Sequence, residues 1–211
     1  MVATSAQRIV EEFGGLFISS HAALVFAFNF SSQQYDRPMM NRLAAPAIGT
    51  GKGLAGLDGA AQAGFIRAEV RDLGRLAEAI LMARLAPRSN PCSCRASCCR
   101  GNKDNKEWTD AISFLADYVR HTALAGCTAH GMMRREYVIR YFTPKEKRVS
   151  LDALAEKHSV DRHTASTHSG KVATLFGGMA ARRDKPAVIG LETVATNAIE
   201  DRLREIGMLS A

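Results

Sequence analysis

The most persistent pattern along the chain is the return of apolar residues every three or four positions, the period of one helix face. Ala63, Ile66 and Val70 follow it, as do the apolar residues between Trp108 and Val119. No stretch sustains the alternation of apolar and polar residues that predicts a β-strand. The pattern therefore predicts an all-α fold. Besides a helix pair between 150 and 172, the expected helices cover 1–12, 21–33, 59–72, 76–85, 104–126, 134–142 and 191–206.

Residues that begin and end helices stand at the edges of these runs. Ser20, Asp58 and Asp104 precede apolar runs, and we expect each to cap or begin a helix. Pro87 follows an apolar run and is expected to stop its helix. The glycine-rich stretch 45–59 separates the first helices, which makes it a natural boundary.

Composition is that of a globular protein, with 211 residues of which 46% are hydrophobic and 23% charged. The apolar stretch Ala22–Phe28 is much shorter than the roughly 20 residues of a membrane helix. Glu11 and Glu12 precede it, where a secretory signal would carry basic residues. Five cysteines, an odd number, argue against a secreted disulfide framework. We therefore expect a cytoplasmic protein with reduced cysteines and no membrane partner.

The basic charge of the chain is concentrated in one part of it. The formal net charge is +7, and the segment 134–185 contains twelve Lys and Arg against six Asp and Glu. A basic surplus confined to one segment is typical of a nucleic-acid-binding module, although a solvated basic surface gives the same count.

The segment 149–172 has the residues of two short helices joined by a tight turn. Ser150 is placed to cap the first helix and Asp161 to cap the second. Ser159 stands where the turn needs a small residue, and Val160 supplies an apolar contact within it. These features predict a helix-turn-helix, whose second helix lies in the major groove of DNA. An ordinary helical hairpin with a polar outer face is the alternative.

The second helix of this unit has an inward and an outward side. Its inward positions are expected at Thr164 or Ala165 and then at Val172. Its outward side chains are short donors and acceptors or cations, which suit base edges and phosphates. They are Arg162, His163, Ser166, Thr167, His168 and Lys171. Lys147 and Arg148 precede the unit, and we expect them to contact the phosphate backbone.

The run from Arg134 to His168 resembles region 4 of bacterial sigma factors and related response-regulator-like domains. The matching residues are Arg140-Tyr141-Phe142, Ser150-Leu151, Leu154-Ala155-Glu156 and Ser159-Val160-Asp161. Two features depart from the family: the connection Thr143–Val149 is longer and more basic, and serine stands at 159 in place of glycine. The resemblance implies a DNA-binding helix-turn-helix domain.

A second resemblance concerns the cysteine run and the residues Asn105-Lys106-Glu107-Trp108 that follow it. This layout is similar to phage late-gene antitermination proteins, some of which join a cysteine cluster to a helix-turn-helix. It implies a prophage transcription regulator that binds double-stranded DNA and contacts RNA polymerase.

Four cysteines are crowded between Pro91 and Arg100, namely Cys92, Cys94, Cys98 and Cys99. Thiolates are the ligands of structural zinc, so we predict a zinc site here, with Cys127 or His130 as a further ligand. The spacing is tighter than in most zinc sites, and redox-active thiols or buried structural thiols remain alternatives. A metal would order a segment that has few apolar residues of its own.

We do not expect an enzyme. Acidic residues are scattered along the chain, without the carboxylate cluster or the His-x-Glu signature of nucleic-acid enzymes. The alternative to a DNA-binding regulator is a helical adaptor that binds RNA polymerase or RNA through its basic face. A homodimer on paired half-sites is expected of such regulators. The expected parts are a helical region at 1–88, the cysteine-rich loop at 89–103, the DNA-binding domain at 104–178, and a C-terminal linker and helix at 179–211.

Overall fold

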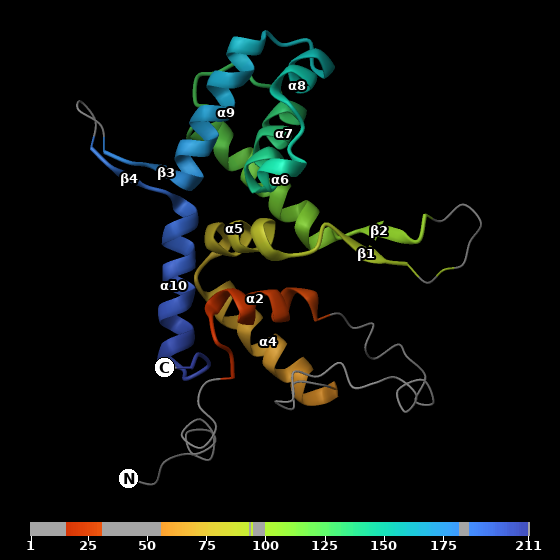
Figure 1. Ribbon diagram of the computed structural model, residues 1–211, viewed down its shortest axis with the longest axis vertical. Helices are drawn as coiled ribbons and strands as arrows, with labels where there is room; N and C mark the ends of the chain where they lie inside the picture. The colour runs from red at the N-terminus through yellow and green to blue at the C-terminus, as the bar shows by residue number, and fades with distance from the viewer. Residues whose placement is uncertain (1–15, 31–55, 93, 95–99, 182–185, 211) are drawn as a thin grey trace. The chain divides into compact units, whose positions relative to one another are not determined.

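The computed structural model describes residues 16–30, 56–92, 94, 100–181 and 186–210, and these are mostly helical (Figure 1). The predicted all-α fold is thereby confirmed. Among the described residues, no helix is long and apolar enough to cross a membrane. The helices are α2 (Ser20–Asn29), α4 (Gly56–Asp72), α5 (Arg75–Leu85), α6 (Lys106–His121), α7 (Gly131–Phe142), the 3₁₀ turn η2 (Lys145–Lys147), α8 (Leu151–Lys157), α9 (Arg162–Gly177) and α10 (Leu191–Glu205).

Contacts within the chain divide it into two compact units. The first comprises Met1–Gly74 with Thr196–Ala211, and the second comprises Arg75–Ala195. Helix α10 begins in the second unit and ends in the first. The helix expected over 1–12 lies outside the described residues, and the four parts expected from the sequence stay a prediction.

In the first unit, α2 packs against α4. Leu24 of α2 and Ile66 and Val70 of α4 are almost completely buried, so this unit has an apolar core of its own. Arg202 of α10 donates a hydrogen bond to Glu69 of α4 at 2.7 Å. The arginine is about half exposed, so water screens this ion pair and the apolar contacts dominate.

Three expected helix starts are displaced by one to three residues. Ser19, and not Ser20, caps α2, because its hydroxyl accepts a hydrogen bond from the first turn at 3.1 Å. Asp58 lies in the first turn of α4, which begins at Gly56. Asn105, rather than Asp104, caps α6. For α2 and α6 a neighbouring residue takes the capping position, which sequence alone does not locate to the residue.

The second unit is built on α6, which packs against both α5 and α7. Ile112, Leu115 and Val119 of α6 are fully buried at helical spacing, as the sequence predicted. Trp108 is also buried, and its indole N–H donates to the Ala83 carbonyl oxygen at 3.2 Å. Since Trp108 is the only tryptophan in the chain, its fluorescence reports on the folding of this unit.

A half-buried polar cluster ties α5 and α7 to the first turn of α10. The Arg84 guanidinium donates two hydrogen bonds to the Glu192 carboxylate, one of them at 2.7 Å. The Tyr141 hydroxyl donates to the same carboxylate at 2.6 Å. Burial alone would raise the pKa of Glu192, but the hydrogen bonds from Arg84 and Tyr141 outweigh it and lower that pKa.

Glu192→Gln is expected to destabilise the second unit by about 2 kcal/mol at about pH 7, because Arg84 then lies half-buried without its counter-charge. The folded-state pKa of Glu192 is lowered, so this stabilisation is present above the unfolded value of about 4.3 and is lost as the pH falls through the folded value. Urea unfolding followed by Trp108 fluorescence measures the free energy of unfolding of the wild type and the variant at each pH. An equal loss of stability in the variant at about pH 7 and at about pH 2 would contradict the ionic contribution.

Two short antiparallel strand pairs accompany the helices. Strands β1 (Ser89–Pro91) and β2 (Asn102–Asp104) flank the cysteine segment, and β3 (Gly178–Met179) pairs with β4 (Val188–Ile189) after α9. The sequence did not predict them, because strands of two or three residues are too short to display an alternating pattern.

Two glycines allow the backbone to cross closely where β3 and β4 meet. A Cβ on Gly190 would lie 2.2 Å from the Phe176 carbonyl oxygen and 2.5 Å from the Gly178 nitrogen. Gly178 has φ +78°, and a Cβ there would lie 2.4 Å from the Val188 carbonyl oxygen. Side chains at either position would therefore force the end of α9 and the start of α10 apart.

Candidate nucleic-acid interface

Helices α8 and α9 form a packed pair joined by His158–Asp161. Ser150 caps α8 by accepting a hydrogen bond from the Ala153 N–H at 3.1 Å. Asp161 caps α9 by accepting from the Thr164 N–H at 2.9 Å. This backbone hydrogen bond holds the pKa of the Asp161 carboxyl below its usual value. Both caps are those predicted from the sequence.

The turn between the two helices closes around Ser159, whose φ is +53°. The Ser159 N–H donates to the Glu156 carbonyl oxygen at 3.2 Å, and the Val160 N–H donates to that of Ala155 at 2.9 Å. These two bonds form a Schellman motif, in which the left-handed residue is usually glycine. Here a serine holds that conformation, which costs a residue with a Cβ about 1–2 kcal/mol.

Ser159→Gly is expected to stabilise the second unit by about 0.5–1 kcal/mol, because glycine adopts this φ freely but loses more backbone entropy on folding. Ser159→Val is the opposite control and should destabilise it, since a β-branched residue fits this region poorly. Urea unfolding followed by Trp108 fluorescence measures both variants. A glycine variant no more stable than the wild type would show that the turn stores no strain.

The α9 side chains predicted to contact DNA lie mostly on the exposed face of the helix. The exposed ones are Arg162, His163, Thr167 and Lys171, and Ser166 is half-buried. The opposite face is a buried stripe that includes Ala165, Val172 and Phe176. Val172 was predicted to be buried, and of the two alternatives Thr164 and Ala165 it is Ala165 that is buried. We call the exposed side, with its four exposed residues and Ser166, the outward face of α9.

His168 corrects one expectation, because it was assigned to the outward side and is in fact buried. It follows Ala165 by three residues and precedes Val172 by four, which places it in the buried stripe. Its ring meets that of Tyr137 edge to face, with centroids 5.9 Å apart. Burial and then the nearby Lys171 charge lower the pKa of His168, so the ring stays neutral at neutral pH.

Arg162 leads the outward face and forms an ion pair with Asp152 of α8. The two side chains are 62% and 66% exposed. An ion pair this exposed is worth at most about 1 kcal/mol, because water screens both charges. The guanidinium can therefore exchange Asp152 for an acceptor on a ligand at little cost.

Two cations in the basic connection before α8 differ in their surroundings: one is exposed to solvent, and the other is hydrogen-bonded within the protein. Lys147 is exposed, as expected of a phosphate contact. Arg148 is half-buried and donates to the carbonyl oxygens of Thr143 at 2.7 Å and Tyr141 at 3.2 Å. It thus satisfies carbonyls at the end of α7, a role that sequence reasoning did not assign to it. The signal was an arginine shortly after a helix end, where carbonyls need donors.

The cysteine segment begins and ends at the paired strands β1 and β2, in which Pro91 lies opposite Asn102. Cys92 is half-buried and Cys94 is exposed, whereas Cys98 and Cys99 lie outside the described residues. Within the part of the chain that the structure describes, no three potential metal ligands gather together. The zinc site stays a prediction.

Comparison with known proteins gave no relative. No family model, no curated protein and no solved structure matches the chain. Function must therefore be argued from the residues themselves.

Proposed function

We propose that the protein is a sequence-specific DNA-binding transcription regulator of phage or prophage type, acting in the cytoplasm. In this proposal α8 and α9 form a helix-turn-helix, and α9 enters the major groove. The observation that carries it is the outward face of α9, which is polar, exposed and backed by a buried stripe that fixes its orientation.

The proposed contacts follow from the chemistry of that face. Arg162, in the first turn of α9, presents the forked donors that match the O6 and N7 atoms of guanine. His163 and Thr167 can exchange hydrogen bonds with neighbouring base edges. Lys171 and Lys147 would bind phosphates, which fixes the register of the protein without reading sequence.

Further partners rest on the sequence resemblance. Similarity to sigma region 4 and to phage antitermination proteins favours RNA polymerase as a second partner, with the protein acting as an antiterminator. A homodimer on paired half-sites and a zinc ion held by the cysteine segment complete the proposal. Elemental analysis of the purified protein, with and without a Cys92/Cys94 double substitution, tests the zinc.

Selection from a pool of random duplexes, carried out with the full chain at about 100 mM salt, tests the proposed function. We expect enrichment of a defined sequence, and loss of that enrichment in a variant lacking Arg162. Bound duplexes without any common sequence would contradict the proposal. Binding to RNA polymerase or RNA that is independent of Arg162 would instead identify a helical adaptor.

Gly170→Ala is expected to separate stability from DNA binding. Gly170 is exposed on α9, and a Cβ there would meet nothing within 4 Å. Alanine should therefore stabilise the helix by about 0.5–1 kcal/mol. If the helix backbone approaches DNA, the added methyl group should lower duplex affinity. Urea unfolding and a duplex titration measure the two effects, and a variant with higher stability and unchanged affinity would show that DNA does not approach α9 at this point.

A further inference from the structure

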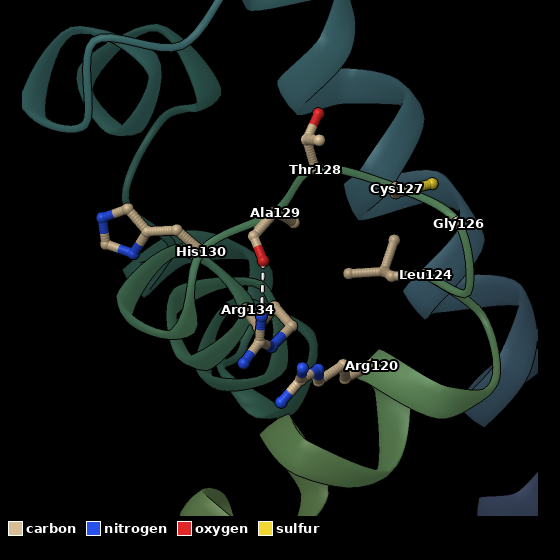
Figure 2. A pocket seen from close by; sticks show the side chains of 8 residues that line it. All are labelled: Arg120, Leu124, Gly126, Cys127, Thr128, Ala129, His130 and Arg134. Atoms are coloured by element: carbon tan, nitrogen blue, oxygen red, sulfur yellow. Dashed lines mark hydrogen bonds between the residues drawn. The ribbon is translucent and has the colours of Figure 1, made fainter.

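A basic depression lies in the second unit between the end of α6 and the start of α7 (Figure 2). Its volume is about 580 Å³, and none of the described residues that line it is acidic. Two arginines do: Arg120 comes from the last turn of α6 and Arg134 from the first turn of α7. Two guanidinium groups beside one hollow, without a carboxylate in its lining, favour an anionic ligand.

Arg134 has a side-chain N–H donor that is not paired with any acceptor in the described part of the protein. One of its terminal nitrogens donates to the Ala129 carbonyl oxygen, as the dashed line in Figure 2 shows. Its Nε is buried and has no hydrogen-bond partner among the residues that the structure describes. A buried N–H without an acceptor costs about 1–3 kcal/mol, so contacts within the protein leave the Arg134 guanidinium incompletely satisfied.

Arg120 is exposed, and it has no ion pair with any carboxylate among the described residues. Most of the other arginines described in this unit are engaged, as Arg84 and Arg162 are with carboxylates. A guanidinium held at a hollow without a counter-charge is suited to phosphate, whose oxygens match its forked donors.

The start of α7 also contributes positive electrostatic potential at the depression. His130 caps α7, with its Nδ1 accepting a hydrogen bond from the Met132 N–H at 3.1 Å. This bond leaves the proton of the neutral ring on Nε2, which makes that atom a donor. The positive end of the α7 dipole lies at the same place, so helix and side chains favour the same sign of ligand.

The depression is connected to the outward face of α9 through Lys171. The Lys171 ammonium donates to the Cys127 sulfur at 3.4 Å, and Cys127 lines the depression. Figure 2 shows the loop that carries Cys127 and Thr128 running beside a helix that the contact identifies as α9. Cations therefore extend from the start of α7 to a helix proposed to lie in the groove.

We propose that Arg120 and Arg134 form a phosphate-binding site for the DNA backbone that flanks the groove occupied by α9. This inference rests on the proposed function. A site of about 580 Å³ is far wider than a single phosphate, and Lys171 joins it to α9, so the sugar-phosphate strand fits better than a free phosphate ion.

The test uses Arg120→Ala in the full chain, because Arg120 is exposed and forms no ion pair with any residue that the structure describes. Duplex affinity is measured between about 50 and 300 mM salt. We expect Arg120→Ala to reduce the slope of log K against log salt by about one and to leave the preferred sequence unchanged. Arg120→Lys should retain the slope, since it retains the charge. Arg75→Ala, which removes an exposed arginine on α5, is the matched control and should also retain it.

A second experiment distinguishes binding of the DNA backbone from binding of a free phosphate ion. Inorganic phosphate is titrated into the wild-type protein at constant ionic strength, while the arginine side-chain N–H signals are followed by NMR. A reduced duplex slope in Arg120→Ala, with phosphate binding that is weak or absent, supports the backbone site. Phosphate binding that disappears in Arg120→Ala, with an unchanged duplex slope, overturns it in favour of a small phosphorylated ligand.

The two proposals fail in different ways. A wild-type protein that binds no duplex overturns the proposed function and the backbone site together. A wild-type protein that binds its selected duplex, with the same salt slope in Arg120→Ala, overturns only the backbone site.

Discussion

Arg162→Ala is expected to lower the affinity for a selected duplex about tenfold to a hundredfold, without destabilising the protein. The reason is that Arg162 leads the outward face of α9 and is restrained only by an exposed ion pair with Asp152. Loss of one bidentate guanine contact costs about 1–3 kcal/mol of discrimination. Fluorescence anisotropy of a labelled duplex measures the affinity, and urea unfolding followed by Trp108 fluorescence measures the stability.

Two further variants make this result specific. Arg75 is 61% exposed, against 62% for Arg162, and is also paired with a carboxylate, so Arg75→Ala removes the same charge from a different helix. It should change duplex affinity by no more than about twofold. Asp152→Asn releases Arg162 and removes a negative charge beside it, so affinity should rise. Equal losses in Arg75→Ala and Arg162→Ala would mean that binding depends on net charge alone.

Gly190→Ala is expected to destabilise the second unit by about 3 kcal/mol or more, which is among the larger costs of a single methyl group. The new Cβ would overlap the Phe176 carbonyl oxygen and the backbone of Gly177 and Gly178, and backbone cannot rotate away as a side chain can. Urea unfolding followed by Trp108 fluorescence measures the loss.

The matched control for this change is Gly170→Ala, in which the same methyl group is added in the same unit where a Cβ meets nothing within 4 Å. The two variants should have opposite signs: destabilising at Gly190 and stabilising at Gly170. A Gly190→Ala variant as stable as the wild type would contradict the close backbone crossing at the base of β3 and β4.

The parts of the candidate interface that depend on local sequence were predictable. Capping by Ser150 and Asp161 and burial of Ala165 and Val172 follow from hydrogen-bonding chemistry and helical period within a few residues. The same period, applied strictly, also buries His168. That histidine was expected on the outward side because its chemistry suits DNA, but residue type alone does not decide which way a side chain faces.

The parts that depend on distant residues were not predictable. The depression brings together Arg120 and Arg134 across the connection between α6 and α7, and nothing in their spacing marks them as neighbours. The contact between Lys171 and Cys127 joins residues of different helices and loops in the same way. Arg148 was expected at DNA because it is basic. Its position shortly after a helix end indicated a role with the last carbonyl oxygens, but the sequence does not show which of them it reaches.

Photocrosslinking from α9 tests most directly the claim that α9 reads DNA. A photoreactive amino acid is placed at Thr167, on the outward face of α9, and, as a control, at Asp117, an exposed position on α6. With the selected duplex, we predict crosslinks to bases from position 167 and essentially none from position 117. A protein that still binds the duplex but crosslinks no better from 167 than from 117 would contradict the claim that α9 reads DNA.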